Sequence, residues 1–157
     1  MGEREAEEVL KVFKEHAVNY KIFDHAPVYT SEEASRIRNV ELKTGVKAML
    51  VKTREGKFFL SDMAANRRID FAKLEGITKS RHIRFATREE VLSVTNCEPG
   101  SVHPLGRLFG VETYLDNSVL ENEFVNFNIG MLTRSVQIKS EDLLRLMKPD
   151  FQGDFSK

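Results

Sequence analysis

Several features common in other protein classes are missing from this 157-residue sequence. It has one cysteine, Cys97, which excludes an internal disulfide framework and a cysteine-rich zinc site. No apolar run approaches the roughly 20 residues that a membrane-spanning helix needs. The acidic, polar start of the chain is unlike the basic and then apolar layout of a signal peptide. We therefore expect a cytoplasmic protein that engages no membrane.

No charge of one sign dominates the chain either. Its 24 basic residues balance 24 acidic ones, which argues against a non-specific binder of DNA or other polyanions. The balance hides an asymmetry, because residues 1–42 carry a net charge of −3, residues 43–84 of +7 and residues 85–157 of −4. The basic third indicates either a local phosphate-facing patch or cations dispersed over several solvated faces.

The residues that are present indicate one mixed α/β domain over residues 1–157. A composition of 41% apolar and 31% charged residues is typical of a globular domain with a core. We expect a partly barrel-like sheet of about six strands, flanked by helices, and a frayed tail from about residue 149. Periodicity and capping residues predict helices over residues 3–17, 30–38, 70–76, 87–94 and 140–147. They predict strands over residues 20–24, 47–53, 57–62, 81–85, 111–116, 123–128 and 133–138.

Most standard catalytic motifs are absent. The sequence contains no GxGxxG or Walker-A motif, and its four histidines lack the spacing of zinc ligands. We therefore expect neither a cofactor nor a metal. Cys97 is either a nucleophile paired with His103 or, as is commoner for a lone cysteine, a small buried hydrophobe.

Two segments remain as candidates for a site. The loop from Cys97 to Gly106 combines glycines and prolines, so it can present consecutive backbone N–H groups to a carbonyl or oxyanion. The alternative is an ordinary tight connection before the next strand. Lys47 opens an apolar strand directly after Thr44 and Gly45. It can place a point charge on a phosphate or carbonyl, or it can be a solvated strand-end lysine.

Four segments, in this order, resemble the YbaK/prolyl-tRNA-synthetase-associated domain family of trans-editing aminoacyl-tRNA deacylases. They are Asp24-His25-Ala26-Pro27-Val28-Tyr29-Thr30-Ser31-Glu32-Glu33-Ala34, Thr44-Gly45-Val46-Lys47-Ala48-Met49-Leu50-Val51-Lys52, Gly100-Ser101-Val102-His103-Pro104-Leu105-Gly106, and Phe127-Asn128-Ile129-Gly130 with the strand and helix that follow. Each motif is weak alone, but the ordered set covers roughly residues 20–147 and is fairly specific.

The resemblance implies metal-independent hydrolysis of the ester that joins a wrong, small amino acid such as Ala, Cys or Ser to the tRNA 3′ end. It implies that Lys47 orients the substrate and stabilises charge. The backbone cradle would be the GxxxP loop, formed by Gly100, Ser101, Val102, His103 and Pro104. Substrate-binding residues would be His25, Tyr29, Thr30, Leu50, Met63, Asn128 and Gly130. The implied partners are the aminoacylated tRNA end and an aminoacyl-tRNA synthetase.

The chain differs from the family pattern at two places. His103 stands where many members have Ser or Thr before the proline, and residues 126–130 stand where several have a His-Pro pair. The second difference motivates an alternative function, a non-catalytic module on the same fold that binds a tRNA end, a nucleotide or a synthetase. The geometry discriminates between the two functions: an editing site requires that Lys47 and the Gly100–Pro104 loop face one pocket.

Overall fold

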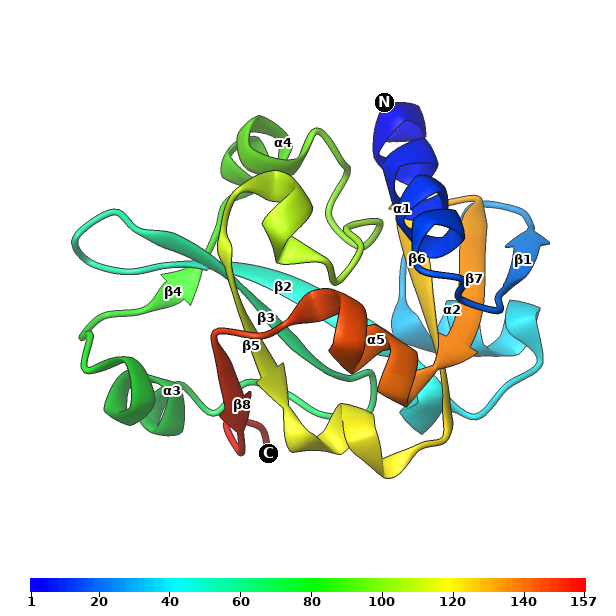
Figure 1. The fold of residues 1–157 in the computed structure, drawn as a ribbon. Helices are drawn as coiled ribbons and strands as arrows, with labels where there is room; N and C mark the ends of the chain where they lie inside the picture. Colours follow the sequence, from blue (N-terminus) through cyan, green and yellow to red (C-terminus); the bar gives the residue numbers. More distant parts are fainter.

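The computed structural model describes all 157 residues of the chain. Its helices are α1 (Glu3–Glu15), α2 (Ser31–Arg38), α3 (Phe71–Thr78), α4 (Arg88–Thr95) and α5 (Ser140–Met147), with 3₁₀ turns η1 (Leu42–Thr44), η2 (Gly106–Phe109) and η3 (Asn117–Glu121). Its strands are β1 (Lys21–Asp24), β2 (Val46–Lys52), β3 (Phe58–Ala64), β4 (Arg84–Phe85), β5 (Glu112–Asp116), β6 (Phe124–Met131), β7 (Arg134–Lys139) and β8 (Phe151–Gly153). Figure 1 shows their arrangement.

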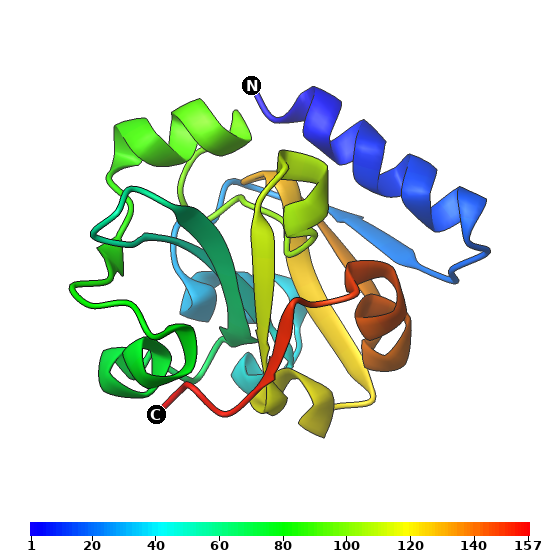
Figure 2. The same cartoon turned by 60° about the vertical axis from the view of Figure 1, so that its left-hand side comes forward.

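The strands form two sheets. The smaller sheet has the order β1-β7-β6 and is antiparallel, and the larger has the order β4-β2-β3-β5-β8, with β3, β5 and β8 parallel. A bridge between Gly45 and Asn126 connects the start of β2 to β6. Figure 2 shows the molecule with β3, β5 and β8 of the larger sheet in front and β6 and β7 of the smaller sheet behind them. The predicted mixed α/β class is confirmed. The strands do not close into a barrel, and they form two sheets where one of about six strands was expected. All seven predicted strand ranges contain a strand, and β8 is an eighth that was not predicted.

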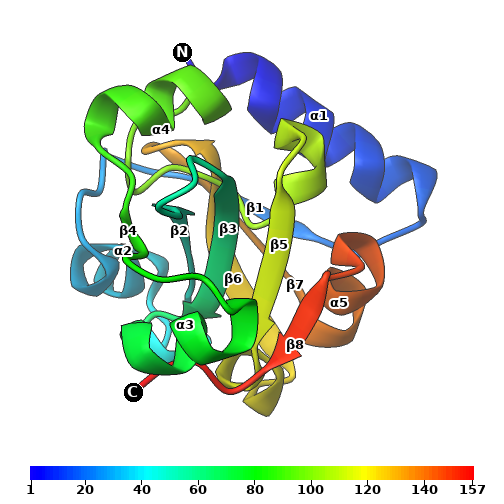
Figure 3. The same cartoon turned by 90° about the vertical axis from the view of Figure 1, so that its left-hand side faces the viewer.

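Helices cover both sheets and complete the core. α1 contacts β6 and α5 contacts β7 (Figure 3). Apolar side chains of these helices and strands share one core, so the two helices bury the apolar face of the small sheet. On the large sheet, α3 packs on the face that carries Phe59 and Met63, whereas α4 packs near Leu50 and Leu60 on the other face. None of the helices is both long enough and apolar enough to cross a bilayer.

Side-chain caps fix the start of the helices next to the site. The Thr30 hydroxyl accepts a hydrogen bond from the Glu33 N–H, and the Thr87 hydroxyl accepts one from the Glu90 N–H. Each bond satisfies an amide that the first helical turn leaves free. These two boundaries are therefore readable from the sequence. The last helix differs, because Ser140 is its first helical residue and donates to the Asn122 carbonyl instead of capping.

The expected frayed tail after Pro149 is wrong. β8 adds in parallel to β5, and Phe155 is fully buried. The Asp116 carboxylate accepts hydrogen bonds from the Phe155 N–H at 2.8 Å and from the Ser156 hydroxyl at 2.7 Å. The tail is ordered because these contacts bury an aromatic ring and satisfy its backbone, which its local composition does not reveal.

Asp62 is a buried carboxyl in the middle of β3 and has no hydrogen-bond partner. It lies opposite Ala48 of β2 and beside Leu115 of β5. Burial raises its pKa well above the usual value, because a charged carboxylate would be poorly solvated there. Burial therefore favours the protonated form of this side chain in the folded protein.

Candidate functional site

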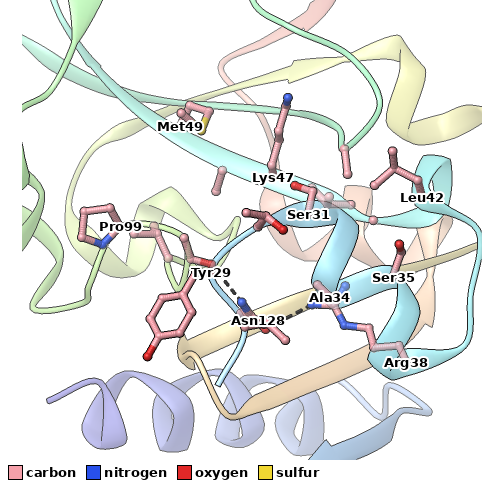
Figure 4. A pocket seen from close by; sticks show the side chains of 18 of the residues that line it. Tyr29, Ser31, Ala34, Ser35, Arg38, Leu42, Lys47, Met49, Pro99 and Asn128 are labelled. Atoms are coloured by element: carbon pink, nitrogen blue, oxygen red, sulfur yellow. Dashed lines mark hydrogen bonds between the residues drawn. The ribbon is translucent and has the colours of Figure 1, made fainter. Parts of the chain in front are cut away.

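A cavity of about 320 Å³ lies between α2, the first residues of β2, the loop before Leu105, and β6. Figure 4 shows Lys47 on one side of it and Asn128 and Arg38 on another. Its walls combine apolar side chains with a few polar groups, the usual composition of a small-molecule site. No Asp or Glu lines it. The cavity therefore has two cationic side chains and no carboxylate of its own.

Lys47 lies in the cavity wall contributed by β2. One edge of β2 pairs with β3 along its whole length, but on the other edge β4 pairs only with Val51 and Lys52. The first part of that second edge therefore has no neighbouring strand, and its residues border the cavity. The Lys47 ammonium has no hydrogen bond and no ion pair within the protein. Partial burial lowers its pKa, nearby Glu32 opposes that shift, and Arg68 adds to it. Lys47 thus offers a poorly solvated cation to a ligand.

A turn brings the loop to the opposite side of the cavity. Pro99 and Gly100 are the central residues of this turn, and the Ser101 N–H closes it onto the Glu98 carbonyl at 3.0 Å. The φ of Gly100 is +91°, as the third position of a type II turn requires. The N–H groups of Gly100 and Val102, both cavity-lining residues, have no acceptor in the protein. They remain available to a ligand carbonyl.

β6 holds this loop in place. The Asn128 side-chain NH₂ donates to the Gly100 carbonyl at 2.9 Å, and the Gly130 N–H donates to the Ser101 carbonyl at 2.7 Å. A bulge between Asn128 and Met131 interrupts the ladder with β7, and Gly130 adopts a φ of +94° there. The bulge thus directs one backbone N–H of β6 to the loop.

A polar network lies behind Asn128. Its side-chain oxygen accepts hydrogen bonds from Arg38 Nη2 at 3.1 Å and from the Ser135 hydroxyl at 2.8 Å. Arg38 Nε donates to the same hydroxyl at 3.0 Å, and His25 Nε2 lies 2.7 Å from it. The network connects α2, β6 and β7, and it fixes which way the Asn128 amide points.

The predicted site residues divide into two groups. The structure brings together in the cavity Lys47, Gly100, Val102, Tyr29, Thr30 and Asn128. His25 reaches this site through Ser135, and Gly130 reaches it through the Ser101 carbonyl. Tyr29 is 70% exposed, and its ring points outward beside Pro99 in Figure 4.

The remaining predicted residues do not line the cavity. Met63 packs with Val51 and Phe59 in the core on the α3 side, and Leu50 packs with the α4 side. The Ser101 hydroxyl donates to the Glu98 carbonyl at 2.7 Å, inside the turn. His103 and Pro104 follow the loop into the core. The prediction that Leu50 and Met63 shape the pocket is wrong. Full burial in the cores removes more of their apolar surface from water than a place at the edge of a cavity would.

Cys97 and His103 do not form a nucleophile pair. The Cys97 thiol donates to the Thr95 carbonyl, and burial raises its pKa to about 12. His103 Nδ1 accepts the Leu105 N–H at 3.1 Å, its ring stacks on Phe109, and burial lowers its pKa to about 3. Neither residue lines the cavity. The thiol is therefore protonated at neutral pH and has no base next to it.

The eleven basic residues of the middle third do not gather at the site. Lys43, Lys52, Lys57 and Arg84 form ion pairs with glutamates. Of the eleven, Lys47 alone lines the cavity. The dispersed alternative thus describes this region better than a single patch. No group of three or more His, Cys, Asp or Glu side chains is arranged to hold a metal ion.

Sequence reasoning missed Arg38. It lines the cavity although it lies at the end of α2, where a basic residue is expected to favour the helix dipole in solvent. No local pattern distinguishes it from Arg36, two residues earlier and exposed. Its partners, Asn128 and Ser135, are about ninety residues away in the chain.

Comparison with known proteins gives a consistent picture. A family model described as "Aminoacyl-tRNA editing domain" matches residues 25–146. The multifunctional Ser/Thr-tRNA deacylase ProXp-y of Escherichia coli K12 is 25% identical over 146 residues, which cover 90% of this chain and 87% of that protein. The prolyl-tRNA editing protein ProX of Acetoanaerobium sticklandii is also 25% identical and covers 89% of this chain and 88% of its own.

Larger proteins and solved structures match as well. The proline–tRNA ligase of Bacillus subtilis is 28% identical over 147 residues, covering 82% of this chain but 25% of the ligase. A crystal structure provisionally described as a trans-editing enzyme for prolyl tRNA synthetase superposes with a TM-score of 0.83 at 23% identity and covers 98% of this chain and 97% of its own. The hypothetical protein APE2540 superposes with a TM-score of 0.86 at 18% identity, covering 96% and 99%. These structures share the fold.

Proposed function

The chain belongs to the aminoacyl-tRNA editing domain family, and on this basis we propose that it hydrolyses the ester of mischarged aminoacyl-tRNA in trans. One observation carries the assignment: Lys47 lines the same cavity as Gly100 and Val102, whose N–H groups have no acceptor in the protein. An aminoacyl ester needs little activation beyond charge stabilisation and a positioned water. In this proposal, residues of the cavity wall provide the charge stabilisation without any further group.

In this reaction, water adds to the ester carbonyl, and the bond to the ribose oxygen then breaks. The products are a free amino acid and a tRNA that ends in its terminal hydroxyl. Negative charge develops on the carbonyl oxygen in the transition state. The N–H groups of Gly100 and Val102 would donate hydrogen bonds to this oxygen and stabilise the charge. No side chain in the cavity is a carboxylate or a histidine. The proton acceptor would then be the neighbouring ribose hydroxyl or solvent.

Lys47 would bind the substrate phosphate or the ester itself. Its ammonium is half-buried and forms no ion pair, although Glu32 is near enough to act on its pKa. An anionic ligand would therefore replace the hydration that the ammonium has lost and would bind more favourably for it. Asn128 would act through the loop. Its side-chain NH₂ donates a hydrogen bond to the Gly100 carbonyl and would thereby orient the peptide groups of the Gly100–Pro104 loop. It occupies the region where several members carry a His-Pro pair.

The cavity volume of about 320 Å³ suits a small aminoacyl group together with part of the ribose. We propose the aminoacylated tRNA 3′ end as the partner, and a synthetase as a second one. Since hydrolysis of mischarged tRNA accompanies protein synthesis, we also propose a cytoplasmic location. Editing of this kind supplements binding discrimination between small side chains, which is limited to roughly 10–200-fold per methylene group.

The test is a deacylation panel with tRNAs mischarged with Ala, Ser, Thr or Cys. We expect turnover well above buffer for at least one species, and a loss of about a hundredfold or more in kcat/KM for Lys47→Ala, by analogy with removal of one oxyanion donor. Lys43→Ala is the matched control, because Lys43 is exposed and pairs with Glu41. Binding of tRNA without turnover on any species would instead favour the non-catalytic module.

A further inference from the structure

Arg38 is a cation without an anionic partner in the wall of the cavity. It forms no ion pair, and the cavity lining contains no Asp or Glu. Burial lowers the pKa of its guanidinium to about 10, so the group is still charged at neutral pH. A desolvated charge without a counter-ion is unusual, because buried charges are normally paired.

Its hydrogen bonds use part of its capacity. Nε donates to the Ser135 hydroxyl at 3.0 Å and Nη2 donates to the Asn128 side-chain oxygen at 3.1 Å. A guanidinium has five N–H donors, so those of Nη1 and the second of Nη2 have no partner in the protein. Nη1 is not among the polar atoms sealed from solvent without a partner. Nη1 is therefore accessible to solvent, and it lies near Gly45, another residue of the cavity wall.

The position of Arg38 separates it from the charge at Lys47. The groups that act on the Lys47 pKa are Glu32 and Arg68, and Arg38 is not one of them. In Figure 4, the Lys47 side chain points away from Asn128, whereas Arg38 reaches towards it. Lys47 thus suits a phosphate on the β2 side of the cavity, and Arg38 faces the part of the ligand that lies against α2 and β6.

We propose that Arg38 is a specificity-determining residue that donates a hydrogen bond to an oxygen in the aminoacyl side chain. This inference rests on the proposed function. Val40, Leu42 and Val46 give the cavity an apolar side, so an aliphatic side chain would pack there but leave the guanidinium donors unpaired. A hydroxyl or carboxylate oxygen would pair them, and sites built to hydrogen-bond a ligand oxygen reject analogues that lack it.

The experiment measures binding of adenosine analogues whose 3′ aminoacyl group is joined by an amide that resists hydrolysis. Seryl is compared with alanyl, and threonyl with valyl, because the second pair has nearly the same volume; an aspartyl analogue tests an anionic oxygen. We expect the intact protein to prefer the oxygen-bearing member of each pair about 10- to 100-fold. Arg38→Met should remove most of this preference, and Arg38→Lys should keep part of it.

Arg36→Met is the matched control, since Arg36 is exposed on the same helix, and its preference should be unchanged. Each analogue is also made with a 5′-phosphate. If Arg38→Met abolishes the gain from the phosphate but not the gain from the side-chain oxygen, Arg38 binds phosphate and the proposal is wrong.

Equal affinities for both members of each pair, no binding of any analogue, or an unchanged preference in folded Arg38→Met would also overturn it. If the preference is found but the deacylation panel is negative, the proposed function fails and the assignment of Arg38 stands.

Discussion

The two parts of the segment from Cys97 to Gly106 have opposite environments. Pro99, Gly100 and Val102 line the cavity, and two of their amides have no acceptor. Cys97, His103 and Leu105 are buried, with exposed fractions of 1% or less. The Cys97 thiol and His103 Nδ1 are hydrogen-bonded to nearby backbone groups and the His103 ring stacks on Phe109, whereas His103 Nε2 is buried without a partner. One continuous motif thus contains a part that can bind a ligand and a part that anchors it.

The comparison suggests that partners outside the segment decide which part is functional. Asn128 and Gly130 of β6 hold the cavity-facing part through two carbonyl groups. The buried part is held by apolar packing in the cores around α1 and α4. Substitutions in or next to the two parts should therefore have different effects on activity and stability.

The largest effect is expected from Asn128→Ala, which removes the hold of β6 on the cavity-facing part. Three side-chain hydrogen bonds disappear, to Gly100, Arg38 and Ser135, one of them charge-assisted. We expect a loss of about 2–3 kcal/mol in unfolding free energy and at least about tenfold in deacylation. Urea denaturation and single-turnover deacylation at a temperature where the variant is folded measure both.

Asn126→Ala provides the control for that variant. Asn126 is buried on the same strand and bonds to Thr44 and Gln137, away from the Gly100 loop. It should lose stability but keep its rate. Equal loss of activity in both variants would show that Asn128 acts through general stability.

An intermediate effect is expected from His103, and it should depend on pH. The folded pKa of about 3 lies below the usual 6.5, so the folded state stays neutral while the unfolded state binds a proton as the pH falls below 6.5. The resulting loss of folding stability is close to zero at pH 7, increases as the pH falls and levels off below the folded pKa. Between pH 7 and pH 5 the protein should lose about 2 kcal/mol relative to His103→Asn.

Asp62 contributes with the opposite sign, because its raised pKa keeps a proton in the folded state. The comparison with His103→Asn cancels that contribution, since Asp62 is present in both proteins. Parallel stability curves for the intact protein and His103→Asn would contradict a neutral, buried His103.

The smallest effect on activity is expected from Cys97→Ala, at the start of the buried part. The thiol is protonated, lies outside the cavity and donates to the Thr95 carbonyl, so deacylation should change less than about twofold. Loss of a small buried group should cost about 1 kcal/mol of stability. A large loss of rate with intact folding would reinstate a thiol mechanism.

Local patterns in the sequence determined several parts of this protein. Thr30 and Thr87 mark helix starts because each hydroxyl accepts a hydrogen bond from the N–H three residues later, which the first helical turn leaves free. Such a cap depends only on residues close together in the sequence. Pro99-Gly100 determines the turn, because proline fixes one φ and glycine permits the positive one. The motifs also indicated the family, because four segments with its residue patterns occur along the chain in the family's order.

Tertiary structure decided the rest. Arg38, Ser135 and Asn128 meet through strands far apart in sequence, the tail after Pro149 is ordered by β5 and Asp116, and Leu50 and Met63 are drawn into the cores. Short-range patterns contain no information about such partners. Whether a lysine or arginine is solvated or faces a cavity depends on what packs around it, and that is fixed only when the two sheets come together.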